Sequence, residues 1–157
     1  MPVDPAVLED FLAQRYLAVV STYRADGTAQ LTANWYVAEG GDIYLPTFEQ
    51  AHKVKNVQRD PRAAVLVDAR GSGPMRAAAT NGPATIVEGA EAKAIAERCW
   101  ARYLTPAGLE HPGVGGVLRQ HDPVCVRVRP GFWSWTDQGE FFGGLLESPE
   151  FVLPHSP

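Results

Sequence analysis

The sequence has no apolar run that approaches the roughly 20 residues of a membrane-spanning helix. Its N-terminus lacks the positive charge and the apolar segment of a secretory signal, so we expect a cytoplasmic protein that does not bind a membrane. Cysteine is scarce, because Cys99 and Cys125 are the only two and their spacing fits no metal or redox motif. The four histidines are scattered, and the sequence therefore predicts no metal site.

Positive charge is in short supply as well. Among the 157 residues, 14 are Lys or Arg and 18 are Asp or Glu, which gives a formal net charge of -4. A protein that binds duplex nucleic acid normally carries a broad basic face, so the composition argues against nucleic acid as a partner. No spacing of Ser, His, Asp or Cys suggests a nucleophilic mechanism, and no catalytic residue can be named. The length fits one domain over 1–157, with its folded body at about 10–137 and a C-terminal tail at 146–157.

The densest group of cations stands against this acidic background. It comprises His52, Lys53, Lys55, Arg59 and Arg62, interrupted by the single acid Asp60. The group follows residues 43–47, for which the sequence predicts a strand. A strand that leads into a cation-rich helix is suited to hold an anion, above all a phosphate, because helix amide groups and lysine ammonium groups add to one positive potential. The alternative is that these cations form only the solvated face of a surface helix.

The pattern of apolar residues along the chain predicts a mainly β protein with short helices. Strands are expected over 16–22, 28–37, 43–47, 63–69, 75–87, 124–129, 132–136 and 140–145. Helices are expected from residue 5, over 52–62 and over 88–103, with loops at 70–74 and 104–123. Short strands connected in hairpins favour a small antiparallel barrel.

The predicted strand at 28–37 alternates, which assigns its side chains to two faces. One face holds Ala29, Leu31, Ala33, Trp35 and Val37, and the other holds Thr28, Gln30, Thr32, Asn34 and Tyr36. We expect the apolar face, with Trp35, to pack in the core. The polar face then either contacts a ligand or is simply exposed to solvent.

The last predicted strands carry two further patterns. Trp133 and Trp135 share a strand face, and aromatic side chains of this kind favour a dimer interface. Arg127 and Arg129 share a face of the strand before it, where we expect them to pair with a carboxylate across the sheet.

Three stretches of the sequence resemble the pyridoxamine 5'-phosphate oxidase-like FMN-binding split β-barrels. The first combines residues 21–27 and 31–36, and the third combines residues 126–130 and 133–135. The second and most specific runs over 52–68 and contains Lys-Val-Lys-Asn-Val-Gln-Arg-Asp-Pro-Arg. The form of this stretch is most similar to the flavin/deazaflavin-dependent oxidoreductase branch of the family.

The resemblance implies a homodimer of Greek-key split β-barrels with a cofactor at each dimer interface. The implied cofactor is FMN, with coenzyme F420 as the alternative and haem as a third choice that would need a histidine such as His52. The phosphate would be bound by Lys53, with help from Thr47, His52 and Lys55. The polar edge of the flavin ring would meet Thr32, Asn34 and Tyr36, while the cofactor itself supplies the hydride chemistry.

Two departures from the family pattern restrict the expected activity. Ala51 stands where related sites place Ser or Arg two residues before the phosphate-binding lysine. The substrate-binding Arg-Leu-His-x-Arg segment of true pyridoxamine-phosphate oxidases is replaced by Gly139–Gly144. We therefore expect a flavin- or deazaflavin-dependent oxidoreductase that transfers a hydride to or from a small planar substrate, and not a pyridoxamine-phosphate oxidase. The alternative is a non-catalytic flavin, deazaflavin or haem binding protein that acts as a carrier or sensor.

Overall fold

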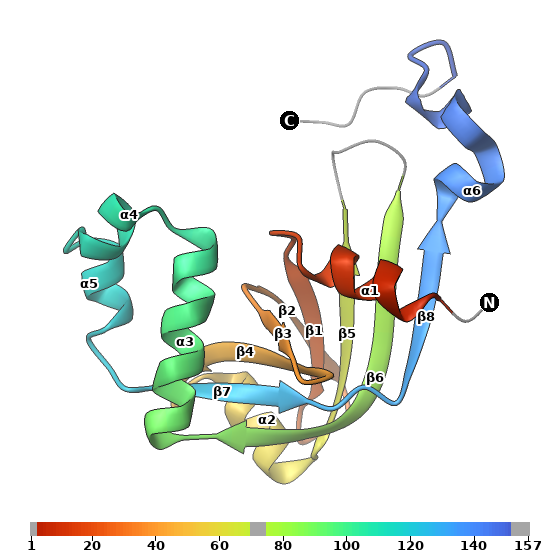
Figure 1. Cartoon of the computed structure of the whole chain (residues 1–157). Coiled ribbons are helices and arrows are strands. Elements are labelled where there is room, and N and C mark those ends of the chain that lie inside the picture. The colour runs from red at the N-terminus through yellow and green to blue at the C-terminus, as the bar shows by residue number, and fades with distance from the viewer. Residues whose placement is uncertain (1–2, 70–74, 152–157) are drawn as a thin grey trace.

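A computed structural model of the chain describes residues 3–69 and 75–151, and in this part the chain forms a strongly curved antiparallel sheet with short helices (Figure 1). The eight strands are β1 (Ala18–Tyr23), β2 (Ala29–Asn34), β3 (Val37–Glu39), β4 (Asp42–Phe48), β5 (Arg62–Asp68), β6 (Arg76–Val87), β7 (Pro123–Val128) and β8 (Phe132–Asp137). The α-helices are α1 (Pro5–Leu12), α2 (His52–Arg59), α3 (Gly89–Tyr103), α4 (Pro106–Glu110), α5 (Gly115–Leu118) and α6 (Gln138–Phe142), followed by the 3-10 helix η1 (Gly143–Glu147). The predicted mainly β class is confirmed.

The strands follow the order β2-β1-β5-β6-β7-β4-β3, and β8 pairs with the first half of β6. Strands β5, β6 and β7 are neighbours in the sheet, and β4, which precedes them in the chain, lies on the far side of β7. This order is a Greek-key arrangement. The two ends of this order, β2 and β3, are consecutive in the chain and are joined by Trp35 and Tyr36 alone. The sheet must therefore curl until its ends meet, and because β2 does not pair with β3 it remains a split barrel.

The strand predicted over 28–37 is thus two strands, and its side chains do not follow one alternation. Tyr36, which ends the predicted polar face, lies fully buried in the core, where its hydroxyl donates to the carbonyl oxygen of Leu12 at 2.9 Å. Trp35 is only half-buried, so the expectation that it packs in the core is wrong. The interruption at these two residues carries the chain from one end of the strand order to the other.

A close approach at Gly82 lets β6 change partners. Strand β6 pairs with β8 up to Asn81 and with β5 up to Pro83, and from Ala84 it pairs with β7. A Cβ atom on Gly82 would lie 1.9 Å from the carbonyl oxygen of Arg129. The long strand can therefore serve both halves of the barrel only with glycine at this point.

The core lies inside the curl of the sheet and is closed at one end by α1. Its largest fully buried side chains include Val20, Leu45 and Val126, and α1 adds Phe11 and Leu12. Trp133 and Trp135 face inward and pack against this core, with Trp135 edge-on to Phe11 at 5.0 Å between ring centroids. The expectation that the two tryptophans lie at a dimer interface is therefore not supported by their orientation.

The outer face of the sheet is rich in small and apolar side chains that remain exposed or half-exposed. Residues opposite each other across the ladders share a face, so one row runs through Leu31, Ser21, Ala64, Asn81 and Phe132. The next row contains Ala33, Val19, Leu66, Ala79 and Ser134. Leu31 is 67% exposed and Phe132 is 68% exposed. The apolar face of β2 therefore points outward, and its polar face points inward, opposite to the prediction.

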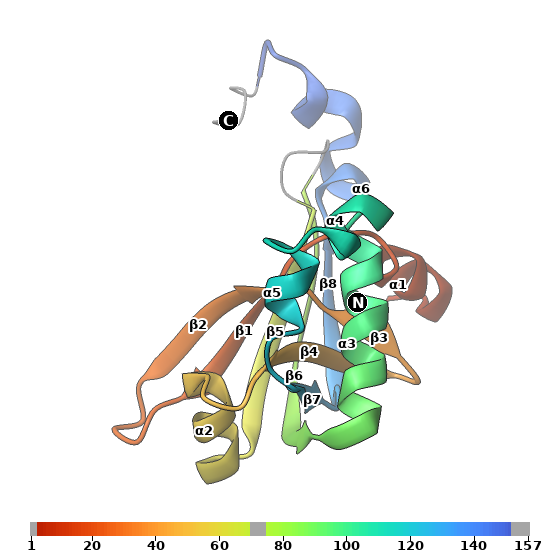
Figure 2. The same cartoon turned by 90° about the vertical axis from the view of Figure 1, so that its left-hand side faces the viewer.

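Two predicted segments differ from the structure. The loop predicted over 104–123 contains α4 and α5, which lie with α3 on one side of the sheet (Figure 2); Thr105 caps α4 through its side chain, and Pro106 opens that helix. The strand predicted over 140–145 is wrong, because the side chain of Asp137 caps α6 and η1 follows. The loop predicted at 70–74 lies outside the described residues.

Candidate functional site

The inward polar face of β2 contacts helix α2, and this contact organises the candidate site. The Nζ of Lys53 donates to Oδ1 of Asn34, the last residue of β2. One turn further along the helix, Nδ2 of Asn56 donates to Oγ1 of Thr22 at 3.1 Å and to Oε1 of Gln30 at 2.8 Å. Residues three apart on a helix lie on the same side, so one face of α2 holds the β1–β2 hairpin.

Arg59 extends the same helix face by a further three residues. Its guanidinium donates to the carbonyl oxygen of Tyr23 at 2.6 Å and to Oδ1 of Asn56 at 3.1 Å. The amide of Asn56 is 5% exposed and is thereby satisfied on both its donor and its acceptor side. Asn56 and Arg59 therefore position α2, which leaves Lys53 as the cation on this face that points toward the pocket-lining Asn34.

The N-terminus of α2 is open. The helix begins at His52, and Ala51, which precedes it, offers no side chain to cap the first amide groups. The buried side chains of Val54 and Val57, on an adjacent side of the helix, pack α2 against the barrel core. An uncapped helix N-terminus provides amide donors and a partial positive charge to an anion.

Lys53 is a half-buried cation without an acidic partner among the described residues. Burial lowers the pKa of its ammonium group from the ordinary value. Its one described hydrogen-bond partner, Asn34, is itself held by Thr32, since Nδ2 of Asn34 donates to the carbonyl oxygen of Thr32 at 2.7 Å and to Oγ1 at 3.0 Å. The site therefore presents one unneutralised positive charge in a fixed polar setting, which favours an anionic ligand.

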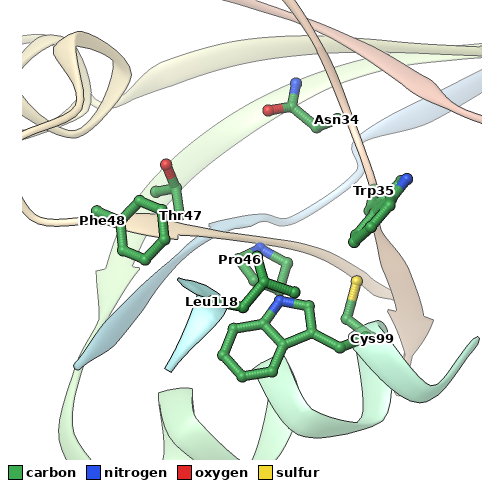
Figure 3. A pocket seen from close by; sticks show the side chains of 8 residues that line it. Asn34, Trp35, Pro46, Thr47, Phe48, Cys99 and Leu118 are labelled. Atoms are coloured by element: carbon green, nitrogen blue, oxygen red, sulfur yellow. The ribbon is translucent and has the colours of Figure 1, made fainter. Parts of the chain in front are cut away.

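A pocket of about 110 Å³ lies beside Asn34, the residue that Lys53 contacts (Figure 3). It is lined by Asn34, Trp35, Pro46, Thr47, Phe48, Cys99, Trp100 and Leu118. Asn34 and Thr47 give it a polar side, and the remaining lining is largely aromatic or apolar. Trp35 is held in this wall by a parallel stack on Tyr103, with centroids 5.2 Å apart and an interplanar angle of 5°. The pocket joins a polar edge, where Asn34 contacts Lys53, to a largely apolar and aromatic side.

A larger groove of about 450 Å³ lies between α1 and the β3–β4 hairpin. Its described lining includes the carboxylates Glu9, Glu39 and Asp42 and no cation. Glu39 is already paired with Arg98, and Asp42 lies 3.4 Å from Arg129 and 3.8 Å from Arg127. These two contacts confirm the predicted carboxylate partner of Arg127 and Arg129. The groove is not suited to an anionic cofactor, so the smaller pocket is the candidate site.

The structure brings together some of the predicted cofactor-binding residues and separates the others. Thr32, Asn34, Thr47 and Lys53 gather at or beside the pocket. Tyr36 does not, because its side chain is in the core, where burial raises the pKa of its hydroxyl. The strand-face argument that grouped Tyr36 with Thr32 and Asn34 is therefore wrong.

His52 and Lys55 lie on α2 but outside the pocket lining, and both are exposed. Their predicted contribution to phosphate binding stays a prediction. The described residues contain no group of three or more His, Cys, Asp or Glu side chains arranged to hold a metal ion. In the part of the chain that the structure describes, no helix has the length and apolar character to cross a membrane.

The apolar wall was missed by sequence reasoning. Trp100 comes from α3 and Leu118 from α5, far along the chain from β2 and β4. No spacing in the sequence relates these residues to Asn34 or Thr47. Phe48 could have been found, because it directly follows Thr47 at the end of the strand that leads into α2.

Comparison with known proteins places this site in a family. Residues 5–122 match the family described as Pyridoxamine 5'-phosphate oxidase. A conserved hypothetical protein from Mycobacterium tuberculosis is 27% identical with a TM-score of 0.73, and the alignment covers 99% of this chain and 91% of that one. An F420 reductase is 25% identical with a TM-score of 0.62, covering 80% of this chain and 94% of that one.

A heme storage protein from Vibrio cholerae shares the fold alone, at 13% identity and a TM-score of 0.64 over 87% of this chain and 95% of that one. No match was found among curated proteins. The segment matched by the family runs from α1 to the residue before β7, so it includes α2, Lys53 and all eight residues that line the pocket. The chain therefore belongs to the pyridoxamine 5'-phosphate oxidase family.

Proposed function

We propose that this protein is a flavin- or deazaflavin-dependent oxidoreductase that transfers a hydride to or from a small planar substrate in the cytoplasm. The observation that carries the proposal is the half-buried Lys53, which has no acidic partner among the described residues and lies beside the open N-terminus of α2. Both cofactor classes carry phosphate, which this arrangement suits. The similarity to an F420 reductase and to the wider family supports a flavin-type cofactor.

The residues present fit such a cofactor at its polar end. Lys53 would bind a phosphate oxygen through a charge-assisted hydrogen bond, with Thr47 and the first amide groups of α2 as further donors. Asn34 and Thr32 would meet the polar edge of the ring, and Trp35 and Trp100 would exclude water from its flat face. When bound, the flavin or deazaflavin supplies the hydride chemistry.

Two observations support a homodimer with the cofactor at its interface. The pocket of about 110 Å³ in one chain is smaller than the roughly 300 Å³ at which ligand pockets typically begin. The outer sheet face with Leu31 and Phe132 is apolar and exposed in one chain, as an interface would be. We propose that a second copy covers this face and completes the site, with a small molecule and no nucleic acid or membrane as the remaining partner.

A non-catalytic carrier or sensor for a flavin, or for haem, is the competing function. The observation in its favour is the exposed His52 at the first position of α2, one residue before Lys53, where an imidazole could ligate haem iron. The heme storage protein with this fold shows that the architecture is compatible with that role in another protein.

The test is to titrate the purified protein with FMN, with coenzyme F420 and with haem, and to record absorbance and dissociation constants. Saturable binding of a flavin or deazaflavin, followed by bleaching when reduced nicotinamide or another hydride donor is added, is the expected result. Binding without any reduction by a panel of hydride donors and acceptors would favour a carrier. A Soret band that disappears in His52→Ala, without flavin binding, would overturn the proposal in favour of haem.

A further inference from the structure

The C-terminal arm, residues 138–151, stands away from the barrel in both views (Figures 1 and 2). It starts at α6, continues through η1 and ends in a turn. Gln138 donates its backbone N–H to the carbonyl oxygen of Met75 at 3.0 Å. Beyond Gln138, the hydrogen bonds of the described arm residues all end within 137–151. Among the described residues, hydrogen bonds thus attach the arm to its own barrel only at its base.

The arm carries large apolar side chains that are exposed. Phe142 is 51% exposed, Leu145 is 58% exposed and Phe151 is 63% exposed. Single exposed apolar residues are ordinary, but three large ones within ten residues of chain are typical of a segment that packs on another surface. The arm therefore needs a surface to cover it.

The outer sheet face differs from the arm because it has few aromatic side chains. Half of the ten residues in its two rows are Ala or Ser, and Phe132 is the one aromatic residue among the ten. Interfaces derive most of their binding energy from a few large anchors, with aromatic residues prominent among them, and small residues contribute little. The sheet face alone is therefore poor in anchors, whereas the arm that continues from β8 at its edge is rich in them.

We infer that the arm of one copy reaches across the edge of the outer sheet face and packs Phe142, Leu145 and Phe151 on a second copy of this chain. The inference rests on the homodimer of the proposed function and adds the segment that holds it together. A two-fold interface applies the same contact twice, so each copy contributes its own arm and receives the other. The outer sheet face sets the geometry of the dimer, and the two arms supply most of its affinity.

The first experiment compares the full chain with a chain that ends at Gln138 and with the triple variant Phe142→Ser, Leu145→Ser, Phe151→Ser. Dimer dissociation constants are measured by sedimentation equilibrium, and barrel folding is checked by circular dichroism. We expect both arm variants to keep the folded barrel. Their dimer dissociation constants should be at least about tenfold higher than that of the full chain, because several anchor side chains are lost. Val117→Ser is the matched control, because this valine is 46% exposed on α5, outside both the arm and the sheet face, and should change nothing.

A second experiment identifies what the arm touches. A photo-reactive benzoylphenylalanine at position 151 is irradiated in a mixture of tagged and untagged chains, and the products are resolved by mass. Cross-links between two chains, at twice the 17.0 kDa of one, are expected. Cross-links confined to one chain, or equal dissociation constants for the full and shortened chains, would overturn the role of the arm while leaving the dimer intact. A monomeric full chain would refute the arm, the proposed dimer and a cofactor site completed by a second copy, while cofactor binding itself is tested separately by the titrations described above.

Discussion

The ammonium group of Lys53 donates a hydrogen bond to the side-chain oxygen of Asn34, and this contact joins the first turn of α2 to the last residue of β2. Asn34 is oriented in turn by Thr32. The cation and the amide therefore hold each other at the edge of the pocket. A ligand anion would compete with Asn34 for the same ammonium group, so binding and local structure are coupled.

Replacing Lys53 with alanine is expected to weaken FMN or F420 binding by about 1.5–3 kcal/mol, the typical contribution of a hydrogen bond to a charged group. Ala51 adds no side-chain contact that could compensate, so we expect the upper part of this range. The control is Lys55→Ala, because Lys55 is exposed on the same helix and outside the pocket lining. Equal dissociation constants for Lys53→Ala and the unaltered protein would remove Lys53 from the phosphate site.

Without cofactor, Lys53→Met is expected to stabilise the protein at neutral pH. Burial lowers the pKa of Lys53, so the unfolded chain binds more protons than the folded chain between the lowered pKa and the ordinary value of 10.5. The stability of the unaltered apoprotein should therefore rise as pH increases through this window, and Lys53→Met should lose that rise. Thermal unfolding between pH 7 and pH 10 measures both effects. A lower melting temperature for Lys53→Met than for Lys55→Met at pH 7 would contradict this expectation.

The two asparagines that α2 brings together are expected to respond differently to alanine substitution. Asn56→Ala leaves the side chains of Thr22 and Gln30 without their shared donor and should destabilise the fold by about 1–3 kcal/mol. Asn34→Ala removes a half-buried group that water can partly replace, so it should cost less stability but lower cofactor affinity. Denaturant titrations and binding titrations on both variants test the difference. If Asn34→Ala proves the more destabilising of the two with unchanged affinity, Asn34 is structural.

Gly82→Ala is expected to destabilise the barrel by at least about 1–3 kcal/mol, the usual range for overpacking. The added Cβ would lie 1.9 Å from the backbone oxygen of Arg129, so β6 and the segment after β7 must move apart. Gly116→Ala is the control, since the nearest atom to its added Cβ is 3.7 Å away. Urea denaturation of both variants gives the comparison, and equal midpoints would show that the close approach can relax without cost.

Strand positions were predictable because alternation is a local property. Val124, Val126 and Val128 identify β7, and its inward residues are buried as the pattern requires. Alternation does not say which face meets the core, and the inward side of β2 is polar because it meets α2 rather than the apolar interior. The apolar face of β2, with Leu31 exposed, therefore points outward, although its composition predicted that it would pack in the core.

The polar edge of the site was predictable and its apolar wall was not. Lys53, Asn34 and Thr47 lie near one another in sequence, and the motif around α2 has a strong pattern. Trp100 and Leu118 reach the pocket only through the packing of α3 and α5 on the sheet. Helix α4 was missed although Thr105 and Pro106 are a helix-start signal, because the surrounding glycines and prolines favour a loop.

The ladder between β4 and β7 has a consequence for how the chain folds. It pairs Leu45 with Val126, so its formation closes a long loop of chain. This loop contains α2, β5, β6 and the three helices that follow. The β1–β2 and β3–β4 hairpins need no such closure and can form locally. Chains dominated by distant strand pairings typically fold in milliseconds to seconds, and we expect stopped-flow refolding in this range. Leu45→Ala should therefore slow refolding, because Leu45 pairs with Val126 in the distant ladder whose loop closure contributes to the barrier.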